Sequence, residues 1–311
     1  MVMDRTLRTL TTEQINPHTL HIDTMDSESI VRLMNEEEAV VIQAVKEAIP
    51  DIAKAVDLIV QQFKKGGRLI YLGAGTSGRL GMLDASECPP TFGVPPEKVQ
   101  FVLAGGSEAF LKGIEDAEDD EGAAKRDLTA LNPDENDCLV AISASGRTPY
   151  CVSALQIAQE LNVPTVTISC NKSAEMSRYA DVPIEVVCGP EVLVGSTRLK
   201  AGTAQKMVLN MLSTASMIRL GKAYRNLMVD MVPINSKLRE RAKRMVMEAT
   251  EVSYATAEKA LLEANWNVKA AIVMVLADVP AAKAEQLLEE ASGFVRKAVA
   301  MAETDGGEGD G

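Results

Sequence analysis

Five short apolar runs, separated by segments with helical spacing, constrain the fold of this chain more than any other feature. After the third run, for example, Leu155, Ala158 and Leu161 recur at the spacing of a buried helix face. This alternation predicts an α/β fold with a five-stranded parallel sheet covered by helices on both faces. The runs are Leu69–Leu72, Val99–Leu103, Cys138–Ile142, Thr165–Ser169 and Pro183–Val187.

The first run ends in a turn that is suited to holding an anion. From Arg68 the sequence continues R-L-I-Y-L-G-A-G-T-S-G-R-L-G-M-L-D-A-S-E-C-P-P-T. The glycines let backbone N–H groups converge, and the start of the next helix adds the positive end of its dipole. Thr76 and Ser77 add hydroxyl donors, and Glu87 lies about three helical turns further on. A phosphate held beside a carboxylate suggests an enzyme that acts on a phosphorylated small molecule.

The same turn also satisfies the G-x-G-x-x-G pattern of dinucleotide-binding proteins. That function requires an acidic residue at the end of the second strand to bind the ribose hydroxyls. Here the second run is followed by Ala104-Gly105-Gly106-Ser107, so the acid is missing. We therefore disfavour a nicotinamide cofactor and expect none. A turn that serves packing alone is equally disfavoured, because two hydroxyls stand among the glycines.

A second hydroxyl-rich loop, Ser143-Ala144-Ser145-Gly146-Arg147-Thr148, follows the third run directly. Pro149 then stands at the first position of a predicted helix. In the flavodoxin-like strand order 2-1-3-4-5, strands 1 and 3 are neighbours and define the crevice where ligands bind. Both hydroxyl loops would then face one pocket, which predicts phosphate binding.

Two acidic regions and one basic segment are candidates for the remaining chemistry. Glu87 stands in a mostly apolar stretch before a predicted helix end at Pro89-Pro90, and Glu118 belongs to the acidic run G-I-E-D-A-E-D-D. For most carboxylates of that run a solvated surface is the simpler interpretation. The segment 195–206, which contains Lys200, would either contact a sugar or only begin a buried helix with exposed cations.

Charge and composition exclude several classes of partner. The formal net charge is −12 and aromatic residues make up 4%, so we expect no nucleic acid partner. The five cysteines form no C-x-x-C pair, which is typical of reduced thiols. The sequence has no H-E-x-x-H motif or Cys/His cluster, so we do not expect a zinc site. His18 and His21 are expected to be hydrogen-bonded arm residues. No signal peptide or membrane span is visible, so we expect a cytoplasmic protein.

The chain is expected to divide into four segments. Residues 1–50 would form an arm and a helix ending at Pro50, residues 51–250 the sugar-phosphate domain, residues 251–302 a small three-helix unit, and residues 303–311 a disordered acidic tail. The helical patterns of the small unit are Tyr254–Ala264, Val268–Leu276 and Ala281–Val299, and Trp266 would anchor its core.

The two hydroxyl loops resemble the phosphosugar-binding loops of sugar isomerase (SIS) domains. G-A-G-T-S-G-R-L-G, D-A-S-E-C-P-P-T-F and S-T-R-L-K-A-G-T-A-Q-K-M-V-L-N-M are also similar to the N-acetylmuramic acid 6-phosphate etherase family. The N-terminal N-P…I-D-T segment and a helical C-terminal unit resembling ubiquitin-associated domains fit as well. The resemblance implies an SIS fold and cleavage of the D-lactyl ether of N-acetylmuramic acid 6-phosphate. The products would be N-acetylglucosamine 6-phosphate and D-lactate, in cell-wall sugar recycling.

The resemblance also implies roles for single residues. Glu87 would protonate the departing lactate and Glu118 would be the second acid–base residue, without a metal or cofactor. The phosphate would be held by Ser77, Ser143, Ser145 and Thr148, with Lys200 a weaker candidate, and the chain would form a homodimer. Two alternatives stay open: a non-catalytic phosphosugar sensor, which needs no carboxylate pair, and an aldose–ketose isomerase, which needs no acid for an ether oxygen.

Overall fold

A computed structural model describes residues 9–306 of the chain, which divides into two compact units. The first unit contains the residues up to Ser86 and Pro96–Ser213, and the second contains Glu87–Pro95 and the residues from Thr214 onward. Over residues 9–306 no single helix is long and apolar enough to cross a membrane, and one bent pair, Tyr254–Glu263 with Val268–Ala277, passes by length and composition only.

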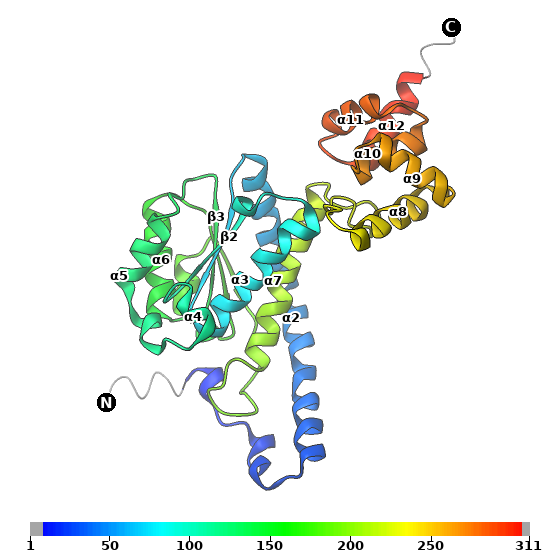
Figure 1. Cartoon of the computed structure of the whole chain (residues 1–311). Helices are drawn as coiled ribbons and strands as arrows, with labels where there is room; N and C mark the ends of the chain where they lie inside the picture. Colours follow the sequence, from blue (N-terminus) through cyan, green and yellow to red (C-terminus); the bar gives the residue numbers. More distant parts are fainter. Residues whose placement is uncertain (1–8, 307–311) are drawn as a thin grey trace. The chain divides into compact units, whose positions relative to one another are not determined.

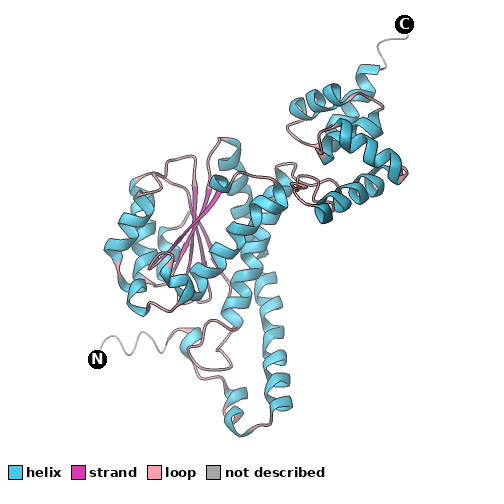
Figure 2. Cartoon of the chain, in the orientation of Figure 1, coloured by secondary structure: helices cyan, strands magenta, loops and turns pink. Residues whose placement is uncertain are grey.

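The core of the first unit is a parallel sheet, whose strands are magenta in Figure 2. The strand order is β2-β1-β3-β4-β5, as predicted. Its strands lie where the apolar runs predicted them, although β5 begins one residue earlier and ends at Glu185. Gly73 at the end of β1 pairs with Leu103 on one side and with Ile142 on the other. The bounds are β1 (Leu69–Gly73), β2 (Val99–Leu103), β3 (Cys138–Ile142), β4 (Thr165–Ser169) and β5 (Val182–Glu185).

Helices cover both faces of this sheet (Figure 1). On one face Ile70 and Leu72 pack with buried residues of α5 and α6, including Leu128 and Leu155. On the other face lie α2, α3 and α7. The helices of this part of the chain are α2 (Ser27–Lys64), α3 (Gly75–Phe92), α4 (Glu108–Leu111), α5 (Glu121–Thr129), α6 (Pro149–Glu160) and α7 (Lys200–Arg219), with short 3-10 helices η1 (Thr11–Glu13), η2 (Pro17–Thr19), η3 (Ile22–Thr24), η4 (Pro96–Lys98), η5 (Glu115–Asp119) and η6 (Glu175–Tyr179).

The predicted helix break at Pro50 is wrong, because α2 runs without interruption from Ser27 to Lys64. Proline removes one backbone donor and disfavours a helix interior. Here the apolar face continues in register across the proline, with Val45 and Ala48 before it and Ile52 after it, all buried. The burial of this continuous face outweighs the local cost of Pro50.

The turn into α3 explains why glycines stand at two of its positions. A Cβ on Gly78 would clash with the carbonyl oxygen of Gly73, and one on Gly73 would lie 2.9 Å from the backbone nitrogen of Gly78. The start of α3 therefore packs directly on the end of β1, which keeps the N–H groups of the first turn at that edge of the sheet. The predicted helix end at Pro89-Pro90 is wrong, since α3 continues to Phe92.

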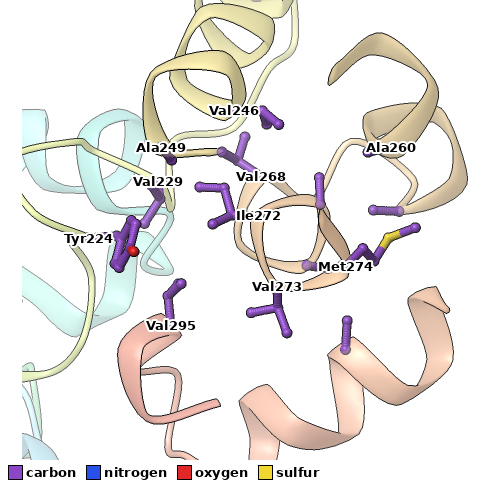
Figure 3. Packing of buried hydrophobic residues seen from close by; sticks show 14 of the residues in the cluster. Tyr224, Val229, Val246, Ala249, Ala260, Val268, Ile272, Val273, Met274 and Val295 are labelled. Atoms are coloured by element: carbon purple, nitrogen blue, oxygen red, sulfur yellow. The ribbon is translucent and has the colours of Figure 1, made fainter. Parts of the chain in front are cut away.

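The second unit is helical and has its own apolar core (Figure 3). Val246, Ile272 and Val273 are buried there, and Trp266 packs against this core from a partly buried position. The predicted helix 281–299 is two helices, because the chain turns through Gly293, whose φ is +80°. The bounds are α8 (Ser236–Thr250), α9 (Tyr254–Glu263), α10 (Val268–Ala277), α11 (Ala281–Glu290) and α12 (Val295–Gly306). Residues 303–306 of the predicted tail thus belong to α12, and residues 307–311 lie outside the described part.

We expect Gly78→Ala to lower the free energy of unfolding by about 1–3 kcal/mol, because the added methyl group must displace backbone. Urea unfolding measures the change. Gly113→Ala is the matched control, since a Cβ there meets nothing within 4 Å. Equal stability of the two variants would contradict the close packing of α3 on β1.

Candidate active site

Three hydroxyl groups converge in the loop between β3 and α6, as the sequence predicted. Ser143 Oγ lies 2.8 Å from Thr148 Oγ1 and 3.2 Å from Ser145 Oγ. The backbone N–H of Gly146 donates to Ser143 Oγ at 3.1 Å. Gly146 has a φ of +69°, and a Cβ there would clash with Ala174, so only glycine closes this turn easily. The hydroxyls thus gather at the positive end of the α6 dipole.

The first hydroxyl loop leaves the neighbouring strand at the same edge of the sheet. Gly73 pairs with Ile142, so the residues after them enter the two loops side by side. Ser77 is buried, and its hydroxyl donates to Gln205 Oε1 at 2.9 Å. Its hydroxyl is therefore already engaged within the fold, and Ser77 does not line the cavity described below. Thr76 is partly buried, with its methyl group facing Gly202 of α7.

A cavity of about 650 Å³ brings the second hydroxyl loop together with Glu118. The charge of Glu118 reaches the start of α6, where it adds to burial in raising the pKa of Cys151 to about 12. Other walls come from the N-terminal arm and from the starts of α5 and α6. The lining residues are Leu10, Glu13, Glu118, Asp119, Glu121, Ser145, Arg147, Thr148, Pro149, Val152, Ser153, Gln156 and Glu175.

Glu87 is not among the residues that line this cavity. It is exposed near the end of α3, although we expected it within an apolar stretch. Glu87 belongs to the second compact unit, whereas the residues that line the cavity belong to the first.

Lys200 does not line the cavity either, because it is a buried ion-pair partner. Its ammonium group donates to Glu37 Oε2 at 2.7 Å, and its side chain is 2% exposed. Asn16 Nδ2 donates to the same oxygen at 2.7 Å, and His18 Nδ1 lies 2.8 Å from Glu37 Oε1. His18 is thus a hydrogen-bonded arm residue, as predicted. Lys200 and Glu37 tie the arm to α2 and α7.

The ionisation of Glu37 depends on these partners. Burial raises its pKa, but the hydrogen bonds from Lys200, His18 and Asn16 outweigh burial and lower the pKa to about 2. The carboxylate is therefore ionised throughout the physiological range.

Asn171 connects the arm to the hydroxyl loop itself. Its side-chain oxygen accepts from the backbone N–H of Thr11 at 2.7 Å, while its amide donates to Thr12 Oγ1 at 3.1 Å and to the carbonyl of Ala144 at 3.0 Å. Two arm residues, Leu10 and Glu13, therefore form a fixed wall of the cavity. The sequence analysis missed this role, because the arm has no periodic pattern and its partner lies in a distant loop.

Neither the cysteines nor a metal cluster offers a second site among residues 9–306. None of the five cysteines forms a disulfide, all five are buried, and burial raises the pKa of Cys138. In the part of the chain that the structure describes, no group of three His, Cys, Asp or Glu residues could hold a metal ion. The cavity lined by Glu118 and the hydroxyl loop is therefore the candidate active site.

Two family comparisons agree with this fold. Residues 118–215 match the SIS domain family, and residues 51–159 match the glucokinase regulatory protein N-terminal SIS domain. The fold and the hydroxyl loops define an SIS-domain protein. Among solved structures, a phosphoheptose isomerase from Francisella tularensis is 17% identical, with a TM-score of 0.47 over 63% of this chain and 100% of that chain.

Three bacterial relatives define the family more narrowly. The N-acetylmuramic acid 6-phosphate etherase of Shouchella clausii is 55% identical over 86% of this chain and 90% of its own. That of Geobacillus thermodenitrificans is 55% identical over 87% and 92%, and N-acetylmuramic acid 6-phosphate etherase 2 of Enterococcus faecalis is 53% identical over 87% and 91%. The chain belongs to the N-acetylmuramic acid 6-phosphate etherase family.

Glu37→Gln should lower the free energy of unfolding by about 3–5 kcal/mol, because it removes the carboxylate that pairs directly with the buried Lys200 ammonium. Urea unfolding at pH 7 measures the loss. The double variant Glu37→Gln/Lys200→Met is the control, and it should regain most of the stability. A single variant as stable as the native chain would show that the pair does not hold the arm.

The same pair predicts a pH dependence. The pKa of Glu37 is lower in the folded chain than its ordinary value of 4.5, so its contribution is complete above pH 4.5 and is lost as the pH falls towards about 2. Over this window the native chain should lose more unfolding free energy than the double variant. If the unfolding free energies of the native chain and the double variant fell in parallel over this pH range, the pH dependence could not be assigned to Glu37.

Proposed function

We propose that the chain is a carbon–oxygen lyase that cleaves the D-lactyl ether of N-acetylmuramic acid 6-phosphate, giving N-acetylglucosamine 6-phosphate and D-lactate. This reaction belongs to the recycling of cell-wall amino sugars. Family membership supports the substrate and the products. The structural observation that supports the proposal is the cavity lined by Glu118, Ser145 and Thr148, in which a carboxylate lies beside a hydroxyl-rich loop.

The chemistry follows from the difficulty of breaking an ether. Once the sugar ring opens, the C1 aldehyde makes the C2 proton more acidic. One group removes this proton while another protonates the lactate oxygen as it leaves C3, and water then adds to the conjugated aldehyde. Each general acid or base contributes about 10²–10⁴-fold. Glu118 is one of these groups, and Ser143, Ser145, Thr148 and the first turn of α3 hold the phosphate.

We infer that Glu87 serves the active site of a second copy of the chain. We assign it the protonation of lactate on the family pattern, although it lies outside the cavity of its own chain. We propose a homodimer. An exposed apolar stripe on α2 supports this, since Val31, Ile42 and Ile49 are 61%, 67% and 50% exposed and recur on one helix face. The five buried thiols favour a reducing compartment, which supports a cytoplasmic location.

The direct test is D-lactate release from N-acetylmuramic acid 6-phosphate. The native chain should release lactate and continue to do so in EDTA, while Glu118→Gln should lose about 10²–10⁴-fold in kcat. Asp116→Asn is the matched control, because Asp116 belongs to the same acidic run but does not line the cavity. If the native chain binds the sugar phosphate without releasing lactate, it is a sensor.

Solvent deuterium separates the lyase from other mechanisms. Deuterium should appear at C2 of the N-acetylglucosamine 6-phosphate product, because that proton is removed and replaced. Conversion of an aldose to a ketose phosphate would instead indicate an isomerase. Lactate release without deuterium at C2 would contradict carbanion chemistry.

Mixing two inactive variants tests the role of Glu87 in the dimer. If Glu87 serves the site of the partner, Glu87→Gln and Glu118→Gln chains that exchange subunits should recover activity, since one site per mixed dimer is complete. Ile42→Glu, designed to disrupt the apolar stripe, should abolish this recovery and shift the mass in light scattering to that of a monomer. No recovery from mixed dimers would exclude a shared site.

A further inference from the structure

The charge of the cavity presents a problem for the proposed substrate. The substrate carries a phosphate group and a lactyl carboxylate, both anionic. Among the described residues that line the cavity, however, five carry carboxylates and Arg147 alone carries a positive charge. Repulsion would oppose binding unless a cation is placed directly on one of the two anionic groups. Arg147 is the lining side chain able to do this.

The guanidinium group of Arg147 is free to bind a ligand. Within residues 9–306 its side chain has no hydrogen-bond or ion-pair partner, although its backbone N–H donates to Ser145 Oγ at 3.3 Å. Two other partly buried arginines of the same unit are fully engaged: Arg68 pairs with Asp137, and Arg79 donates to the carbonyl of Ala109 at 2.6 Å. Arg147 thus differs from them in keeping its donors available.

The position of Arg147 favours the carboxylate over the phosphate. The phosphate already has the clustered hydroxyls of Ser143, Ser145 and Thr148 and the positive end of α6. A planar guanidinium matches a carboxylate through two parallel hydrogen bonds. Because Arg147 belongs to the phosphate loop and lines the cavity with Glu118, its side chain is placed to bind a second anionic group of the same ligand.

We propose that Arg147 is a specificity-determining residue that binds the lactyl carboxylate of the substrate. This inference rests on the proposed function. It explains how one site distinguishes N-acetylmuramic acid 6-phosphate from N-acetylglucosamine 6-phosphate, which has the same phosphate and ring but no carboxylate. Cleavage of the ether removes this contact, so the sugar product is held less tightly than the substrate.

Calorimetric binding in the Glu118→Gln background tests the proposal, because slow turnover allows the intact substrate to be titrated. Arg147→Ala should weaken binding of N-acetylmuramic acid 6-phosphate by roughly 10–100-fold and leave N-acetylglucosamine 6-phosphate within about twofold. The affinity of Arg147→Lys for N-acetylmuramic acid 6-phosphate should fall between those of the chain with Arg147 intact and Arg147→Ala. Lysine keeps the positive charge but cannot form the two parallel hydrogen bonds of a guanidinium group. Arg178→Ala is the control: Arg178 is exposed and lines only a neighbouring cavity, so both ligands should bind as before.

A substrate analogue with a lactyl carboxamide distinguishes a direct contact from a structural role. If Arg147 only stabilised the loop, its removal would weaken binding of the carboxylate and the amide equally. The chain with Arg147 intact should prefer the carboxylate to the amide, and Arg147→Ala should abolish the preference. Equal weakening of both sugar phosphates would assign Arg147 to the phosphate, and unchanged binding of both would show no contact. Either result overturns the proposal. These titrations need no turnover, so they are distinct from a failure of lactate release, which would overturn the proposed function instead.

Discussion

The pairing of β1 with β3 is the constraint on which the rest of the structure depends. It joins two strands that are far apart in sequence, and it starts both hydroxyl loops from paired residues, Gly73 and Ile142. At this edge the first turns of α3 and α6 present backbone N–H groups and hydroxyls together. Without this pairing neither loop would hold more than an ordinary helix cap.

The N-terminal arm is held against the cavity by interactions with residues that are far away in the sequence. Asn171 hydrogen-bonds to Thr11 and Thr12 of the arm, and its amide also donates to the carbonyl of Ala144 in the hydroxyl loop, so both segments share one anchor. Glu37 and Lys200 provide a second anchor in the interior. The buried pair costs desolvation, but it gives the arm one position and makes Glu13 and Leu10 part of the cavity wall.

Part of the fold and of the candidate site could be predicted from the sequence. Buried parallel strands are continuous apolar runs, and the glycine and hydroxyl turns mark where each strand ends, so the sheet and both loops were visible. The helix break predicted at Pro50 was wrong because the rule that proline ends a helix considers only local structure. It does not consider the apolar face that α2 buries on both sides of Pro50. Lys200 misled the prediction because its partner Glu37 lies 163 residues away, and sequence spacing says nothing about such a pair. Arg147 was missed for the opposite reason: its side chain has no hydrogen-bond or ion-pair partner among residues 9–306, and only the fold reveals this.

The central claim is that the hydroxyl loop and Glu118 act on one sugar phosphate. A crystal structure of the Glu118→Gln chain with N-acetylmuramic acid 6-phosphate tests this most directly. The account predicts the phosphate within hydrogen-bond distance of Ser143, Ser145 and Thr148, with C2 or C3 of the sugar facing position 118. A phosphate bound elsewhere, or a sugar turned away from position 118, would contradict it.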